Sequence, residues 1–142
     1  IVEPGSLLMA ITGEGKTRGM TALCQIKTAI NQHLAYITIK SGEMACLFVL
    51  AYLRGMYNKI RANSSGLGST KGAITCGDLK KYPVPVPPFK EQLDVVTYIE
   101  NKSALIDEGV TFLVHQIEKL KEYKSTLINS AVTGKIKVTD EH

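Results

Sequence analysis

Apolar residues along the last third of the chain recur at alternating steps of four and three. These positions are Ile106, Val110, Leu113, Ile117, Leu120, Leu127 and Ala131, with the polar Lys124 at the step between Leu120 and Leu127. Such steps place side chains on one stripe of an α-helix and are typical of a coiled-coil seam. At ~1.5 Å per residue, a helix from Ser103 to Ala131 is roughly 43 Å long. The pattern predicts a long helix that pairs with another helix; the alternative is a helix lying across the core of its own domain.

A run of prolines precedes this helix. Four of the six residues from Pro83 to Pro88 are prolines. Because proline has no amide hydrogen, the run is neither a helix interior nor a central strand. We therefore predict a stiff extended connector and a domain boundary, with a front domain at residues 1–88 and a helical arm with a short tail at residues 89–142. Glu91 then lies in the first helical turn, where a carboxylate favours the positive helix end.

The front domain mixes strand and helix patterns. Apolar or alternating segments predict strands at Ser6–Thr12, Thr21–Lys27 and Leu34–Lys40. A helix is predicted from a Ser41 cap, with Glu43 in its first turn, to about Ile60. A glycine- and serine-rich surface loop follows, and then a short helical turn at Gly77–Tyr82. The predicted fold class is α+β, a mixed β-sheet followed by a long C-terminal coiled-coil helix.

Charge is distributed unevenly over these two parts. Residues 1–88 contain ten Lys/Arg and four Asp/Glu, a net charge of +6, whereas residues 89–142 contain seven and nine, a net charge of −2. The difference favours a polyanion as partner of the front domain and a protein as partner of the arm. The apolar run Met44–Leu53 is about half the ~20 residues that a membrane span needs. We expect a cytoplasmic protein with no membrane partner.

Three scattered cysteines, Cys24, Cys46 and Cys76, contain no C-x-x-C pair. We expect small buried thiols rather than disulfides or a zinc site. His33 and His115 have no neighbours at metal-ligand spacing, and no Ser/His/Asp grouping is present. No metal, no cofactor and no catalytic residue are therefore expected.

The segment GEGKT, at residues 13–17, follows a predicted strand and resembles part of a phosphate-binding loop. The full pattern requires glycine where Ala10 stands. A nucleotide-hydrolysing enzyme is thus a weak alternative. The same composition suits contact with a DNA backbone through Lys16, Thr17 and Arg18, which we expect to be exposed.

Two further segments carry side chains suited to DNA. Asn and Gln amides bond adenine edges, and Lys favours guanine edges or phosphates. The candidates are Asn31, Gln32 and His33 before the third strand, and Ser69, Thr70 and Lys71 in the glycine-rich loop. The alternative for Asn31 and Gln32 is that they only form a turn.

Taken together, these segments resemble the DNA specificity subunit of type I restriction–modification enzymes. The matching pieces are GSLLMAITGEGKTRG, INQHLAYI, GSTKGAITCGDLKKYPVPVPPFKEQ and LINSAVTGKIKV, in the same order and from about Pro4 to Val138. The resemblance implies a target recognition domain that recognises one half of a split double-stranded DNA site, and a helix that separates it from a second recognition domain. This chain would correspond to the later part of one such domain and one helix.

The resemblance also implies partners and a non-catalytic role. Methylation subunits would hold the helix and adjoining surfaces, and a restriction subunit would join the DNA methylation complex. A second specificity unit would come from a homodimer or a tandem repeat. The apolar heptad pattern itself predicts the pairing residues, which are Ile106, Val110, Leu113, Ile117, Leu120 and Leu127. The alternative from another class is a coiled-coil assembly adaptor whose basic domain binds protein.

Overall fold

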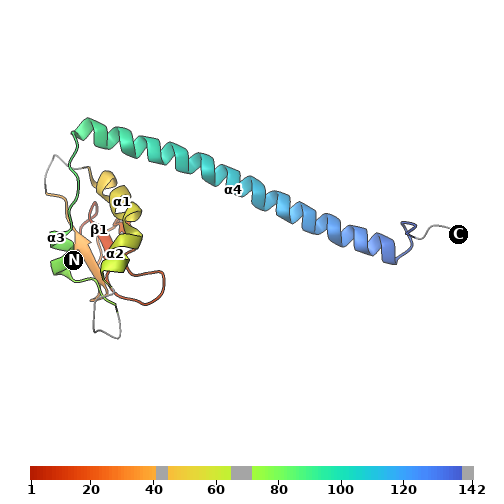
Figure 1. The fold of residues 1–142 in the computed structure, drawn as a ribbon, viewed down its shortest axis with the longest axis horizontal. Helices are drawn as coiled ribbons and strands as arrows, with labels where there is room; N and C mark the ends of the chain where they lie inside the picture. Colours follow the sequence, from red (N-terminus) through yellow and green to blue (C-terminus); the bar gives the residue numbers. More distant parts are fainter. Residues whose placement is uncertain (41–44, 65–71, 139–142) are drawn as a thin grey trace. The chain divides into compact units, whose positions relative to one another are not determined.

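The front of the chain is built around three short strands. The computed structural model describes residues 1–40, 45–64 and 72–138. Strands β1 (Leu7–Ala10), β2 (Thr21–Leu23) and β3 (Leu34–Ile37) form an antiparallel sheet in the order β2-β1-β3 (Figure 1). Each strand lies within a predicted strand region and is shorter than its prediction. Together with the helices described below, the sheet confirms the α+β class.

The central strand β1 supplies the middle of the core. Leu7 lies opposite Leu23 of β2 and Ile37 of β3. Leu7 and Met9 are 0% exposed, and their neighbours Leu8 and Ala10 are half-buried. This alternation directs Leu7 and Met9 toward one face of the sheet, where helix residues complete the core.

Two helices, rather than the single predicted one, pack beside the sheet. They are α1 (Cys46–Gly55) and α2 (Tyr57–Asn63). The chain turns between them at Met56, whose φ of −89° and ψ of 6° lie outside the helical range. The preceding Gly55 is a weak helix former, so the break costs little. The expectation of one helix to Ile60 is therefore wrong, and Ser41 and Glu43 lie outside the described residues.

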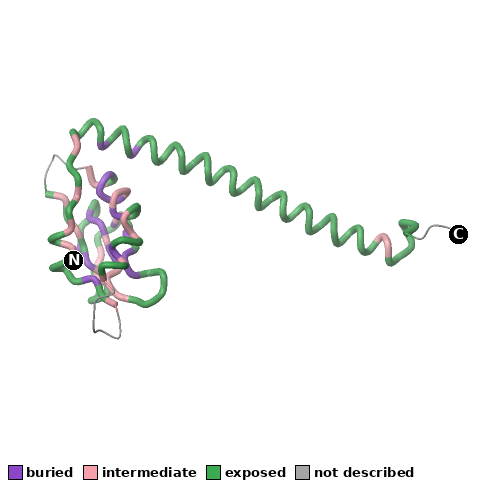
Figure 2. Tube along the Cα trace, viewed as in Figure 1, coloured by how far each residue is buried: buried purple, intermediate pink, exposed green. Residues whose placement is uncertain are grey.

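These helices and the sheet share one hydrophobic core, whose buried residues are among those drawn in purple in Figure 2. Its buried members are Leu7, Met9, Val49, Leu50, Leu53, Ile60 and Ile74. At about 25 cal/mol per Å² of apolar surface, such contacts are the main stabilising term of the front unit.

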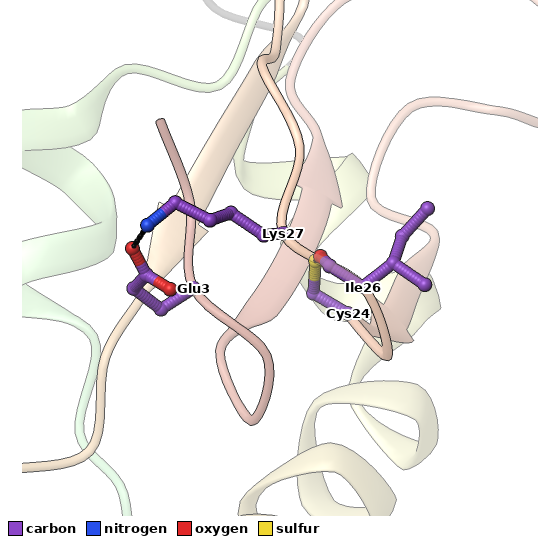
Figure 3. A network of polar contacts seen from close by, with 4 residues as sticks. All are labelled: Glu3, Cys24, Ile26 and Lys27. Atoms are coloured by element: carbon purple, nitrogen blue, oxygen red, sulfur yellow. Dashed lines mark hydrogen bonds and ion pairs between the residues drawn. The ribbon is translucent and has the colours of Figure 1, made fainter.

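The N-terminal segment lies along residues 24–28. Val2 and Thr28 form an antiparallel bridge, and Glu3 pairs with Lys27 at 2.6 Å (Figure 3). Both charged side chains are more than 60% exposed, so their pair contributes little. The backbone bonds at Val2 and Thr28, 2.7 and 3.1 Å long, hold the segment more firmly.

The cysteines differ in burial. Cys24 is buried, and its thiol donates to the Ile26 carbonyl at 3.0 Å (Figure 3). Cys46 is half-buried, which raises the pKa of its thiol. Cys76 is exposed, so the expectation of three buried thiols is wrong for this residue, which lies on the short surface helix described next. All three thiols are free.

The predicted short turn and proline connector are both present. Helix α3 (Cys76–Lys81) begins with a capping box, in which the Thr75 side chain accepts from the Asp78 amide and the Asp78 carboxylate accepts from the Thr75 amide. The Thr75 hydroxyl also donates to the Asp78 carboxylate at 2.6 Å, and this bond together with that from the Thr75 amide lowers the pKa of Asp78. Residues 82–88 have no regular secondary structure, and the Tyr52 hydroxyl fixes their start by donating to the Pro83 carbonyl at 3.0 Å.

Helix α4 (Phe89–Val132) begins directly after the connector and is continuous for 44 residues. Its first turns are fixed by Gln92, which is 0% exposed. The Gln92 side-chain oxygen accepts from the Ala45 amide, and its nitrogen donates to the Pro87 carbonyl, both at 2.8 Å. Sequence patterns did not indicate this role, because a polar residue in a first helical turn is ordinarily solvent-exposed.

The chain divides into two compact units, Ile1–Tyr98 and Ile99–His142, and α4 begins in the first. The proposed domain boundary at residue 88 stays a prediction. Among the described residues, no helix has the length and apolar content that a membrane crossing needs.

Gln92→Glu tests the amide bridge between Ala45 and Pro87. A carboxylate accepts from Ala45 but cannot donate to Pro87, so we expect a loss of about 3 kcal/mol at neutral pH. Burial raises the folded-state pKa of this glutamate above its unfolded value of about 4.3. The loss should therefore be small below that pH and grow as pH rises toward the folded-state pKa.

Urea unfolding at pH 4 and pH 7 measures this loss. Gln116→Glu is the matched control, since Gln116 is exposed on α4, and it should change stability by less than about 0.5 kcal/mol. Equal, pH-independent effects of the two variants would contradict the bridge.

Candidate nucleic-acid interface

Strand register brings two of the predicted segments together. Ala10, the last residue of β1, pairs with Leu34, the first residue of β3. The loop after β1 and the turn before β3 therefore lie at the same end of the sheet. The Ile11 amide donates to the His33 carbonyl at 3.0 Å, and the Thr12 hydroxyl lies 2.9 Å from His33 Nδ1.

A third segment reaches the same place. The Ile74 amide donates to the Ile11 carbonyl at 2.8 Å. Gly72 lies against the Arg18 guanidinium, because a Cβ atom added at Gly72 would fall 1.9 Å from Arg18 Nη1. Ser69, Thr70 and Lys71 lie outside the described residues and directly precede Gly72 in the sequence.

The glycine-rich loop presents only part of its predicted surface. Lys16 and Thr17 are exposed, as expected, but Arg18 is only 6% exposed. The expectation of an exposed Arg18 is wrong, because its side chain turns inward against Gly72. Its Nε atom is buried with no hydrogen-bond partner among the described residues.

The loop also connects two strands, β1 and β2. A nucleotide-binding phosphate loop leads instead into a helix, whose N-terminus helps hold the phosphates. The loop therefore lacks the following helix that a nucleotide-hydrolysing site of this type requires.

Side chains of α1 and α2 hold this loop from the protein side. The Tyr57 hydroxyl donates to the Lys16 carbonyl, and Arg61 Nη1 donates to the Arg18 carbonyl at 2.8 Å. Arg54 Nε donates to the Thr21 carbonyl at 3.2 Å, where the loop enters β2. None of these three donors was predicted from the sequence. The one available signal was their spacing of three and four residues, which places side chains on a common side of a helix.

The second predicted segment forms a tight turn. The Asn31 side-chain oxygen accepts from the His33 amide at 3.0 Å, and the Leu34 amide donates to the Asn31 carbonyl at 3.2 Å. This Asx-type turn agrees with the turn alternative for Asn31. Asn31, Gln32 and His33 are all exposed, so the turn also holds their side chains at the protein surface.

The predicted pairing seam lies on the exposed part of α4. Residues 97–129 of this helix are all exposed (green in Figure 2). Ile106, Leu113 and Leu120 are 60–66% exposed. Counting back in the same steps of three and four, the seam continues through Ser103 and Ile99 to the buried Val96 and Gln92. One helix face thus carries both the buried start and the exposed seam.

A family comparison identifies the chain. The family model for the type I restriction modification DNA specificity domain matches residues 5–111. This chain belongs to that family. The match includes the sheet, α1 to α3, the proline connector and the first half of α4. The family resemblance that was predicted from the sequence is therefore confirmed.

Curated relatives carry the same assignment. The chain is 28% identical over 120 residues to the putative type I restriction enzyme MjaX specificity subunit of Methanocaldococcus jannaschii. This match covers 84% of this chain and 27% of that protein. It is 24% identical over 140 residues to the type I restriction enzyme EcoBI specificity subunit of Escherichia coli, covering 99% of this chain and 28% of that protein. The chain thus spans little more than a quarter of the length of these relatives.

The fold of this specificity domain also matches a solved structure. A chain from structural work on complex assembly and conformational transition of the type I R-M system superposes with a TM-score of 0.77 at 21% identity. The match covers 92% of this chain and 31% of that chain. At this identity the likeness supports the fold.

Arg18→Met and Arg61→Met compare two arginines at the specificity domain's glycine-rich loop. Replacing a buried charge with an apolar side chain of similar length is often neutral or stabilising, and Arg18 Nε has no hydrogen-bond partner among the described residues. Arg18→Met should therefore stay within about 1 kcal/mol of wild type or exceed it. Arg61→Met removes a charged donor from the Arg18 carbonyl and should cost about 1.5–3 kcal/mol. Urea unfolding measures both, and a larger loss for Arg18→Met would show that its guanidinium is well compensated.

Proposed function

We propose that this specificity domain recognises one half of a split site in double-stranded DNA and is the non-catalytic, target-recognising part of a type I restriction–modification complex. The observation that carries the proposal is the convergence of the Lys16 loop, the Asn31 turn and the Gly72 segment at one end of the sheet. The net charge of +6 on residues 1–88 favours a polyanion. The relatives' designation as specificity subunits of restriction enzymes supports the same role.

The convergent segments would divide the work of DNA contact. Lys16 and Thr17, exposed on the loop, would contact the phosphate backbone and fix register. Asn31, Gln32 and His33, held at the surface by their turn, would contact base edges. We keep Ser69, Thr70 and Lys71 as proposed contacts on the sequence pattern. Arg18 would support the loop by packing against Gly72 and would not contact DNA directly, since its buried side chain would have to move to reach a phosphate.

The helix would supply distance and docking. We assign pairing with a second specificity unit, in a homodimer or a tandem repeat, to the seam of Ile106, Val110, Leu113, Ile117, Leu120 and Leu127. A second apolar stripe beside the seam contains Leu105, Phe112 and Tyr123, each 61–64% exposed. Two adjacent stripes provide a wider apolar face than one paired helix covers. We assign this second stripe to a methylation subunit, and methyl transfer and cleavage to the methylation and restriction subunits.

Lys16→Ala and Asn31→Ala should separate phosphate contact from base recognition. Loss of Lys16 should weaken binding to all sequences alike and reduce the slope of log affinity against log salt by roughly 0.9. Asn31→Ala should instead change which sequences are selected from a randomised duplex pool. Lys27→Ala is a control, because Lys27 pairs with Glu3. Duplex binding that is insensitive to salt, or absent, would refute DNA recognition by this domain.

Leu113→Glu tests the seam. A charge at the centre of the stripe should weaken self-association at least tenfold, a cost of about 1.4 kcal/mol. His115→Glu is the matched control on the opposite side of α4, and it should leave association unchanged. Analytical ultracentrifugation over a concentration series measures both. A wild-type mass that stays monomeric at every concentration would exclude the homodimer.

A further inference from the structure

Three carbonyl groups of the glycine-rich loop are bound by side chains of the protein. Three loop carbonyls, at Glu14, Lys16 and Arg18, accept hydrogen bonds from α2. The donors are the Tyr57 hydroxyl and the two terminal nitrogens of Arg61. All the acceptors are backbone atoms, so the arrangement depends on the path of the loop and not on its side chains.

The two donors also support each other. The Arg61 guanidinium lies over the Tyr57 ring, 5.4 Å from its centroid. Gly19, with φ of +87°, passes close to both, since a Cβ atom there would lie 3.3 Å from Arg61 Cγ and 3.5 Å from Tyr57 Cδ2. Only glycine adopts this backbone angle at little cost in so narrow a space. The end of the loop therefore lies directly against the pair.

The amide groups of the loop differ from its carbonyl groups in their hydrogen bonding. Among the described residues, no acceptor is found for the amide hydrogens of residues 13–18. The next amides along the chain that have acceptors are those of Gly19 and Met20, which donate to the carbonyls of Ala10 and Thr17. A loop with bound carbonyls and unbonded amides attracts anions, because successive N–H groups carry partial positive charge. Carbonyls turned to solvent would instead repel a phosphate.

From this arrangement we infer that Tyr57 and Arg61 are positioning residues for DNA binding, which hold the loop amides and Lys16 ready for a backbone phosphate. The inference rests on the proposed function and adds to it a mechanism. Neither residue needs to touch DNA, because each acts through a loop carbonyl. The phosphate contact then depends on a hydroxyl and a guanidinium behind the loop as well as on the lysine in front of it.

Tyr57→Phe is the most selective test, since it removes one hydroxyl and keeps the ring beneath Arg61. The matched control is Tyr52→Phe, which removes a hydroxyl that donates to the Pro83 carbonyl, away from the loop. Fluorescence anisotropy with a labelled duplex of randomised sequence, over a salt series, measures affinity. Tyr57→Phe should weaken binding about three- to tenfold, as expected for one lost hydrogen bond, and flatten the salt dependence. Tyr52→Phe should match wild type in both.

Arg61→Lys provides a second variant that keeps the charge. Lysine lacks the planar fork that reaches two carbonyls, so binding should weaken although net charge is unchanged. Thermal melting of all three variants separates stability from binding. The inference is overturned if Tyr57→Phe and Arg61→Lys bind like wild type, or if Tyr52→Phe weakens binding as much as Tyr57→Phe.

Wild type and Lys16→Ala distinguish failure of the inference from failure of the proposed function. If wild type binds the duplex and Lys16→Ala weakens it while the two α2 variants do not, only the positioning role is lost. If wild type shows no salt-dependent binding, the proposed function fails and the positioning role fails with it.

Discussion

The pairing of β1 on both of its edges is the interaction on which the candidate interface depends. Because β1 bonds to β2 and β3 at once, its register decides which loops meet. Ala10 opposite Leu34 places the loop at residues 11–20 beside the turn at residues 31–33. A shift of one residue would also exchange the buried Leu7 and Met9 for the half-buried Leu8 and Ala10. Hydrophobic burial therefore protects the register, and the register assembles the surface.

A second constraint is the way polar groups behind that surface are satisfied. Arg54 and Arg61 place guanidinium groups on backbone carbonyls, where charged donors form strong hydrogen bonds. Arg18 differs, because its buried Nε has no partner among the described residues. Burial of a polar donor that forms no hydrogen bond is costly. The positive charge of Arg18 is thus buried in the front unit, and the net charge exposed at the surface is smaller than the value counted from the sequence.

Patterns that repeat could be predicted from the sequence, and single contacts could not. Two-residue alternation located the strands, the missing proline amides located the connector, and the seam located α4, because each signal is summed over many residues. The direction of one side chain depends on its neighbours in space, so Arg18 was expected outside and lies inside. Gln92 had no detectable signal, since its partners Ala45 and Pro87 are assembled only by the fold. For Asn31, the competing turn chemistry was predicted as an alternative and is present.

The continuity of one face along α4 sets a limit on any helix pairing. Gln92 and Val96 occupy this face and are already buried, so a partner helix has access to it only from Ile99 onward. From there to Ala131 the helix rises about 50 Å at 1.5 Å per residue. An unstructured chain of the same length would have a mean end-to-end distance of about 30 Å with a broad distribution. The proposed recognition of two half-sites at a fixed separation would require the narrow distribution, because base pairs are discrete steps along the duplex. A continuous helix would meet that requirement, whereas an unstructured linker of equal length would not.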